Sequence, residues 1–207
     1  NPNYDISYST GGVDFDGSGD YLSVPNSSDY SFGSGDFTVE GWMNIDSTSS
    51  ANTIVGVWDY DNAQRSWNLE VNNSGGMSFL VSPNGSSSTD LVGGSVSVGQ
   101  WTHFAGVRNG NTLTLYLNGT QVATSSYSGS IYDNTDDNLF IGALNGSANT
   151  TTGMISNIRV VKGTAVYTSN FDPPSAALTN ITNTKLLCCQ STSSTTTAAV
   201  TPQTLNA

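Results

Sequence analysis

The chain has 207 residues, of which 36% are hydrophobic and 10% are charged, and its formal net charge is −11 at pH 7. Five basic residues stand against sixteen acidic ones, so the chain lacks the clustered lysine and arginine that nucleic-acid partners and anionic membranes require. No apolar run approaches the roughly 20 residues of a membrane-spanning helix. We therefore expect neither nucleic-acid binding nor membrane insertion.

The N-terminal segment NPNYDISYST has no basic and no apolar region of a signal peptide, and the missing initiator methionine indicates a trimmed or partial chain. The next segment, GGVDFDGSGDYLSVP, predicts strands at about residues 12–16 and 21–25 around a Gly-Ser-Gly turn. Its acidic residues Asp14, Asp16 and Asp20 copy the start of a calcium-binding EF-hand loop, but Pro25 stands where that loop needs glutamate. We favour an acidic hairpin over a calcium site.

The segment FTVEGWMNI at residues 37–45 alternates in the manner of a half-buried strand. Val39 and Met43 fall on one face, and Glu40 and Trp42 fall on the other. We expect Glu40 and Trp42 to pack beneath a covering loop, with a ligand site as the alternative.

Three further runs, TIVGVW at 53–58, SWNLEV at 66–71 and MSFLVS at 77–82, predict sequential antiparallel strands. Alternation assigns Trp67, Leu69 and Val71 to the core. The turn DYDNAQ separates the first two runs.

Residues 102–125, THFAGVRNGNTLTLYLNGTQVATS, contain two Asn-Gly pairs between alternating runs, which predicts type I′ hairpins and a β-meander. LFIGAL at 139–144, GMISNIRVVKG at 153–163 and KLLCCQ at 185–190 add further strands. Roughly a dozen short strands with turn residues between them predict an all-β fold, an antiparallel two-sheet β-sandwich of the jelly-roll type. We expect one domain over residues 1–190 and a low-complexity Ser/Thr-rich tail or linker over 191–207.

The two cysteines, Cys188 and Cys189, are neighbours in the chain. Alternation along a strand would point them to opposite faces, and a disulfide between adjacent residues is strained. We expect free thiols.

Five segments are informative through the order in which they occur: VDFDGSGDYLSVPNS, FTVEGWMNI, QWTHFAGVRNGNTLTLYLNGTQVA, LFIGALNG and ISNIRVVKG. The most specific feature is Trp101 before a strand that contains His103, followed by a strand that ends in Leu-Asn-Gly. In this order the segments resemble the concanavalin A-like, laminin G-like (LamG) jelly-roll family over about residues 11–190. The run KGTAVYTSNFDPPSAALTNITNTKLLCCQ is similar to modules in structural and fibre proteins of tailed phages, particularly marine ones.

The resemblance implies a sandwich with a curved face, used in the family for glycan binding, protein contacts, adhesion and, in some relatives, sugar hydrolysis. Many relatives also hold calcium in rim loops. Hydrolysis with this fold places acidic residues at alternating positions of one strand, and Glu40 and Glu70, the only glutamates, have no such neighbours. His103 is the only histidine, and we interpret it as a structural one. We expect no enzyme.

The loop VWDYDNAQRSW has the aromatic and polar mixture of a sugar site. We predict that Trp58 and Tyr60 stack on a sugar ring while Asp61, Asn62 and Arg65 bind hydroxyls. The alternative is that Trp58 caps the end of the sandwich. Calcium, which prefers oxygen ligands, is predicted at Asp59 and Asp61 or at Asp133 and Asp136, with solvated turns as the alternative.

Together these features predict a non-enzymatic, lectin-like adhesion module of a larger virion or fibre protein that recognises surface glycans. The alternative is a structural or decoration module that packs against other virion subunits without binding sugar. In either case we expect a virion-surface or extracellular location and a multimeric assembly.

Overall fold

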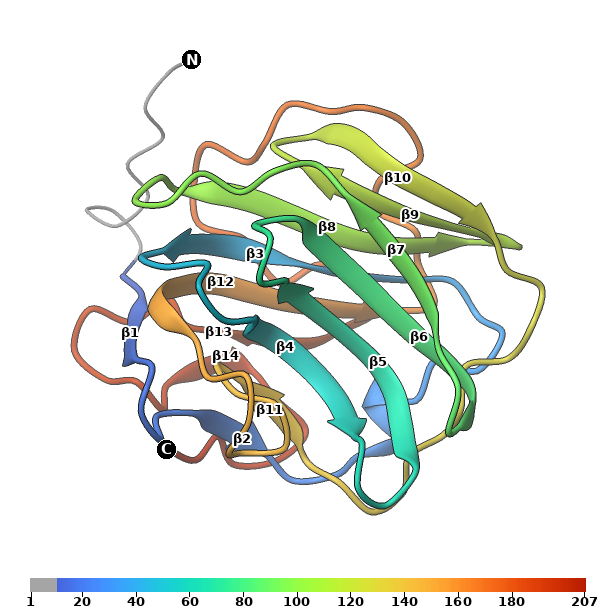
Figure 1. The fold of residues 1–207 in the computed structure, drawn as a ribbon, viewed down its shortest axis with the longest axis horizontal. Coiled ribbons are helices and arrows are strands. Elements are labelled where there is room, and N and C mark those ends of the chain that lie inside the picture. Colours follow the sequence, from blue (N-terminus) through green and yellow to red (C-terminus); the bar gives the residue numbers. More distant parts are fainter. Residues whose placement is uncertain (1–10) are drawn as a thin grey trace.

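Two antiparallel sheets pack face to face across one hydrophobic core in the computed structural model, which describes residues 11–207 (Figure 1). Residues 1–10, which the sequence assigns to the domain, lie outside the described part. Within that part, no helix is long and apolar enough to span a membrane. The prediction of an all-β, two-sheet antiparallel sandwich is confirmed.

The first sheet has the order β10-β9-β8-β3-β12-β13-β14, with β1 pairing to β12. Its strands are β1 (Val13–Asp16), β3 (Phe37–Ile45), β8 (Thr102–Asn109), β9 (Thr112–Leu117), β10 (Thr120–Ser126), β12 (Thr152–Lys162), β13 (Thr184–Cys188) and β14 (Ala198–Val200). The second sheet has the order β2-β11-β4-β5-β6-β7. Its strands are β2 (Leu22–Val24), β4 (Asn52–Asp59), β5 (Gln64–Val71), β6 (Met77–Gly85), β7 (Thr89–Gly93) and β11 (Leu139–Ile141). One 3₁₀ turn, η1 (Ser28–Tyr30), follows β2.

Strand alternation builds the core as the sequence predicts. Val39 and Met43 of β3 face Trp67 and Leu69 of β5 in the shared core, and none of the four is exposed. The indole Nε1 of Trp67 donates a hydrogen bond to the carbonyl oxygen of Tyr30 at 2.9 Å. Trp67 is therefore a core residue with its polar atom satisfied.

The predicted meander is present as β8, β9 and β10, but its two turns differ. Asn118 and Gly119 have φ angles of 46° and 73°, as a type I′ turn requires. In the first turn Asn109 pairs with Thr112, so the central residues are Gly110 and Asn111, of which Gly110 alone has a positive φ. The first Asn-Gly pair is therefore shifted by one residue from the predicted type I′ position.

The acidic hairpin predicted near the N-terminus does not form. β1 pairs with β12 in the first sheet, whereas β2 pairs with β11 in the second. The Gly-Ser-Gly segment between them carries the chain from one sheet to the other, and Gly17 and Gly19 adopt positive φ angles there. Distant strands decide these pairings, so local turn residues could not reveal them.

The tail predicted at 191–207 belongs in part to the sandwich. β14 pairs with β13, and Leu205 lies in the core at 3% exposure. Ser23 and Asn206 exchange two backbone hydrogen bonds of 2.9 and 2.8 Å. The prediction of a tail or linker is wrong here because backbone pairing and one buried leucine suffice to dock a polar segment.

Cys188 and Cys189 are both buried and free. Their Sγ atoms lie 3.5 Å apart, because Cys189 adopts a φ of 60° that turns its side chain back toward that of Cys188. The expectation of side chains on opposite faces is wrong, since the strand ends at Cys188 and alternation no longer applies.

The segment after β12 passes along the outer face of the first sheet (Figure 1). Tyr167 and Phe171 of this segment stack on each other, with ring centroids 3.6 Å apart, and pack against Tyr116. Residues 163–183 are hereafter the covering segment. They close the face on which Glu40 and Trp42 lie.

Candidate functional site

Two loops predicted separately as binding elements meet at one end of the sandwich. Gln64 Nε2 donates a hydrogen bond to Asp136 Oδ2 at 3.0 Å, and Asn134 Nδ2 donates to the carbonyl oxygen of Gln64. Ser66 Oγ donates to the carbonyl oxygen of Tyr132 at 2.7 Å. Residues 59–65 and 132–138 are hereafter the acidic loop end.

Trp58 does not reach the surface at this end. Its side chain is 1% exposed and packs against Leu80 and Leu144 on the outer face of the second sheet. The predicted stacking of a sugar on Trp58 therefore has no accessible ring. Trp58 instead belongs to a small cluster on the outer face of the second sheet, separate from the main core, so the alternative of a cap on the end of the sandwich does not describe its place either.

Tyr60 is exposed and held from two sides. Its side chain is 46% exposed, and among the described residues it is the one large aromatic side chain so exposed. Arg65 places its Cζ atom 4.7 Å from the Tyr60 ring centroid, and the Trp58 ring meets the Tyr60 ring edge to face at 5.8 Å. These contacts fix a flat apolar surface on the outside of the molecule.

Asp59 organises the loop rather than facing solvent. It is 2% exposed, and its two carboxylate oxygens accept hydrogen bonds from Asp61 N at 2.8 Å and from Asn62 Nδ2 at 2.6 Å. Asp61 and Asn62 themselves are exposed beside Tyr60. The loop thus presents polar groups on a rigid turn.

The partner loop is organised in the same way by Asn134. This side chain is 3% exposed, and its Oδ1 accepts hydrogen bonds from the backbone of Asp136 at 3.0 Å and of Asp137 at 2.9 Å. Burial raises the pKa of Asp137, and the charges of Asp59 and Asp136 add to the rise, against a hydrogen bond from Asn134. Asp133 accepts a hydrogen bond from Ser31 Oγ.

The predicted calcium ligands do not form a preformed cage. Over residues 11–207, no group of three or more His, Cys, Asp and Glu side chains is arranged to hold a metal ion. The oxygens of Asp59, Asp133 and Asp136 instead accept hydrogen bonds from protein donors. Calcium binding stays a prediction.

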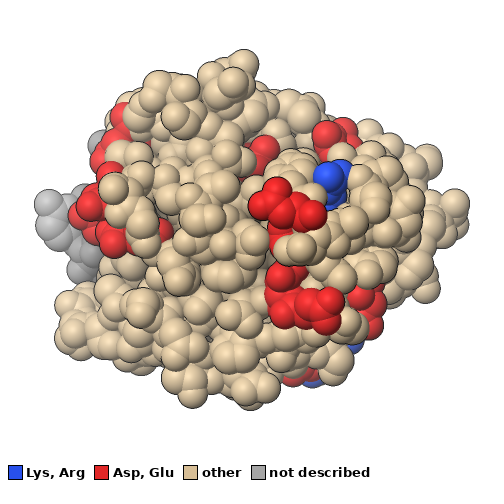
Figure 2. Space-filling view, turned by 60° about the horizontal axis from the view of Figure 1, so that its bottom comes forward, with Lys and Arg blue, Asp and Glu red and all other residues tan. Residues whose placement is uncertain are grey.

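The surface near Tyr60 is acidic. Figure 2 shows acidic side chains gathered in two groups on the face that lies at the bottom of Figure 1, with few basic side chains beside them. On the outer face of the second sheet, burial and then the charge of Asp90 raise the pKa of Glu70, against hydrogen bonds from Asn149 and Asn68. Burial and then the charge of Glu70 raise the pKa of Tyr60, so these groups are neighbours.

Sequence reasoning missed Asp90 as part of this surface. Asp90 lies in β7 and pairs with Leu80 of β6, whereas the sequence patterns predict no strand between residues 82 and 102. Leu91 and Val92 are adjacent apolar residues, so this short strand lacks the alternation that predicts one from sequence.

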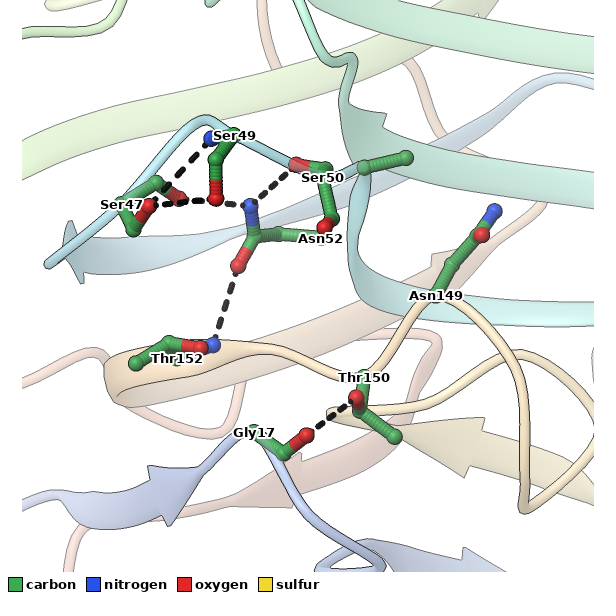
Figure 3. A pocket seen from close by; sticks show the side chains of 9 residues that line it. Gly17, Ser47, Ser49, Ser50, Asn52, Asn149, Thr150 and Thr152 are labelled. Carbon is green, nitrogen blue, oxygen red and sulfur yellow. Dashed lines mark hydrogen bonds between the residues drawn. The ribbon is translucent and has the colours of Figure 1, made fainter.

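A cavity of about 310 Å³ opens at the opposite end of β4 (Figure 3). It is lined by three loops, through Gly17, Ser47, Ser49, Ser50, Ala51, Asn52, Asn149, Thr150 and Thr152. These loops are rich in serine, threonine and asparagine, which are common in connecting turns. Nothing in their local pattern shows that they meet.

Glu40 and Trp42 lie beneath the covering segment, as the sequence predicts, and His103 lies beside them. None is more than 1% exposed. Glu40 Oε2 lies 3.3 Å from His103 Nε2 and accepts a hydrogen bond from the Tyr167 hydroxyl at 2.7 Å. Burial alone would raise the pKa of Glu40, but its contacts with His103, Arg159 and Tyr167 together hold that pKa below its usual value.

The fold is shared with several solved structures of low sequence identity. A proposed carbohydrate-binding protein from Bacteroides ovatus matches 95% of this chain at 17% identity with a TM-score of 0.69. The chain spans 57% of that protein's length. The CBM40 module of the Ruminococcus gnavus IT-sialidase, solved with α2,3 sialyllactose, matches at 15% identity and a TM-score of 0.62 over 76% of this chain and 92% of the module.

Domains LG4-5 of the mouse laminin α1 chain match at 17% identity and a TM-score of 0.55, over 78% of this chain and 45% of theirs. A search of curated proteins finds no match. The Laminin_G_3 family model, described as the concanavalin A-like lectin/glucanases superfamily, matches residues 16–166. These residues make up most of the chain, which therefore belongs to the concanavalin A-like lectin/glucanase superfamily.

Proposed function

We propose that this chain is a non-enzymatic, lectin-like module that binds glycans at the acidic loop end. The observation that carries the proposal is the exposed ring of Tyr60, fixed by Arg65 and Trp58 and flanked by the polar side chains of Asp61 and Asn62. Sugar sites combine an aromatic surface with hydroxyl-binding polar groups in this manner. The carbohydrate-binding proteins of the same fold support this choice of ligand.

The placement of the two glutamates supports a binding role over hydrolysis. Glu40 is buried under the covering segment on the outside of the first sheet, whereas Glu70 lies on the outside of the second. The two carboxyl groups therefore cannot flank one glycosidic bond, which hydrolysis requires at about 5–10 Å. Turnover of a β-glucan would contradict the non-enzymatic part of the proposal.

A glycan array probed with the wild-type chain and with Tyr60→Ala tests the binding. We expect defined glycans to be retained by the wild type and lost by Tyr60→Ala, because the stacking surface is removed. Val98→Ala is the matched control, since Val98 is 49% exposed and lies in the loop before β8. Equal binding by Tyr60→Ala and wild type would contradict the site.

We further propose that the module belongs to a larger virion or fibre protein and acts at a virion surface or another extracellular place. The similarity of residues 162–190 to tailed-phage fibre modules supports this context. The rival function is structural packing against other virion subunits. A folded, multimeric chain that retains no glycan on the array would favour the rival.

Calcium at Asp59 and Asp61 or at Asp133 and Asp136 is tested by thermal unfolding with calcium and with chelator. A ligand that binds the native state raises the midpoint by mass action. A midpoint that rises with calcium concentration confirms the prediction, and an unchanged midpoint contradicts it.

A further inference from the structure

The cavity at the far end of β4 is built by three segments that are distant in sequence. Residues 47–52 lead into β4, residues 149–152 lead into β12, and Gly17 follows β1. β4 begins at Asn52 beside the cavity and ends at Asp59 in the acidic loop end. The cavity and the acidic loop end therefore lie at opposite ends of β4, and Glu70 lies between them, because it accepts a hydrogen bond from Asn149 and its charge acts on Tyr60.

One buried side chain holds the cavity in shape. Asn52 is 2% exposed, and its Nδ2 donates hydrogen bonds to the carbonyl oxygens of Ser47 at 2.9 Å and Ser50 at 3.0 Å (Figure 3). Its Oδ1 accepts a hydrogen bond from Thr152 N at 2.9 Å. Thr150 Oγ1 donates to the carbonyl oxygen of Gly17 at 2.6 Å. A cavity fixed by its own bonds avoids most of the cost of ordering loops when a ligand binds.

Hydroxyl groups remain available along the cavity wall. The hydroxyls of Ser50 and Thr152 make no hydrogen bond to residues 11–207, and those of Ser47 and Ser49 bond only to each other and to the Ser49 backbone. Gly17 keeps room beside Thr152, because a Cβ on Gly17 would lie 2.4 Å from Thr152 Oγ1. Each hydroxyl can both donate and accept a hydrogen bond, as the hydroxyls of a sugar require.

Charge at the cavity disfavours an anionic ligand. No lysine, arginine or acidic side chain lines the wall. Two exposed aspartates stand next to lining residues: Asp46 precedes Ser47, and Asp16 pairs with Thr152 across β1 and β12. Their negative field opposes phosphate, sulfate and acidic sugars.

We infer that this cavity is a second carbohydrate site that takes one neutral sugar residue. The volume of about 310 Å³ lies at the lower limit of ligand pockets, which span about 300–1,000 Å³, and so suits a single ring rather than a chain. The inference shares its ligand class with the proposed function, but it assigns different residues. An experiment can therefore contradict the cavity site without contradicting the proposed site at Tyr60, and the reverse.

Amide chemical shifts of the isotope-labelled chain, titrated with single sugars, test the inference. The probes are N-acetylglucosamine, galactose and glucose as neutral sugars, and N-acetylneuraminic acid and inorganic phosphate as anions. We expect at least one neutral sugar to cause saturable shifts at residues 47–52 and 149–152, and the anions to cause none there. No shift at these residues with any neutral sugar, or shifts with the anions alone, would overturn the inference.

Two variants and a matched control test whether the sugar binds in the cavity. Ser50→Tyr fills the cavity and is expected to weaken the neutral sugar at least tenfold, while Ser34→Tyr, at an exposed serine that does not line the cavity, leaves it unchanged. Should the spectrum show that Ser50→Tyr is misfolded, Thr152→Val removes one hydroxyl and is expected to weaken the sugar. Tyr60→Ala is expected to leave these shifts intact even where it abolishes array binding. Unchanged affinity in a folded Ser50→Tyr chain would contradict the assignment.

Discussion

Arg159 donates two hydrogen bonds to a single carboxylate oxygen of Glu40, from Nε at 3.0 Å and from Nη2 at 2.6 Å. Both side chains are buried, Arg159 at 6% exposure and Glu40 at 0%. Arg159 also donates from Nη1 to the carbonyl oxygen of Thr179 at 2.9 Å, which ties the covering segment to the sheet. The buried ion pair thus helps to hold the covering segment on the outer face of the first sheet.

Glu40→Gln is expected to lower the free energy of unfolding by about 3 kcal/mol, because it leaves the Arg159 charge buried without a counter-ion. Urea unfolding measures the change. The control is Asp29→Asn, which removes the half-exposed ion pair of Asp29 with Lys185 at 3.0 Å and is expected to cost less than about 1 kcal/mol. Equal losses in the two variants would contradict a special role for the buried pair.

The lowered pKa of Glu40 gives this loss a definite pH dependence. Folding favours the charged carboxylate, so its contribution is present above the ordinary pKa of 4.5 and is lost as pH falls through the lowered folded-state pKa. The difference in unfolding free energy between wild type and Glu40→Gln should therefore shrink in acid. A difference that stays constant from about pH 7 to about pH 3 would show that the charge is not responsible.

Folding shifts the pKa of Glu70 in the opposite direction from that of Glu40. Burial and the charge of Asp90 raise its pKa above 4.5, so folding favours the neutral acid, and this stabilisation is lost as pH rises through the raised pKa. Glu70→Gln is expected to increase the free energy of unfolding at about pH 7 and to match the wild type at about pH 3, where both side chains are neutral. A loss of stability at neutral pH would contradict this reading.

Leu205→Ala tests whether the C-terminal segment is part of the fold. Burial of Leu205 in the core predicts a loss of about 2–5 kcal/mol in the free energy of unfolding. Val98→Ala, at an exposed valine, is expected to stay within about 0.5 kcal/mol. A negligible effect of Leu205→Ala would restore the interpretation of this segment as a tail.

Cys188 and Cys189 should resist alkylation in the native chain. Both are buried, and the hydrogen bond between the thiols, together with burial, raises the pKa of Cys188, so little thiolate is available. Mass spectrometry after iodoacetamide treatment should show no label on the native chain and two labels after unfolding without reductant. Rapid native labelling would contradict their burial.

The alternation of apolar and polar residues along each strand was enough to predict most of the fold. Alternation placed Val39, Met43, Trp67 and Leu69 correctly in the core, because a strand face is a local property of the sequence. Motif order gave the family, which the match over residues 16–166 shows. The same alternation placed Glu40 and Trp42 together on the other face of β3.

Pairings between strands that are distant in the chain could not be predicted from local sequence patterns. The partners of β1 and β2, the docking of β14 and the approach of Asp90 to Glu70 depend on strands far away in the chain. The candidate site shows the same limit. Exposure of Tyr60 agrees with the predicted role, but Trp58 and Asp59, two and one positions before it, are buried by contacts that local composition does not specify.

Glycan binding at Tyr60 is tested most directly by isothermal titration of the glycan that the array selects into wild type, Tyr60→Ala and Tyr60→Phe. Stacking of the glycan on Tyr60 predicts saturable wild-type binding, at least a tenfold weaker Kd for Tyr60→Ala, and a nearly unchanged Kd for Tyr60→Phe, which keeps the ring. Tenfold corresponds to about 1.4 kcal/mol of binding free energy. The same Kd for Tyr60→Ala and wild type would contradict glycan binding at the acidic loop end.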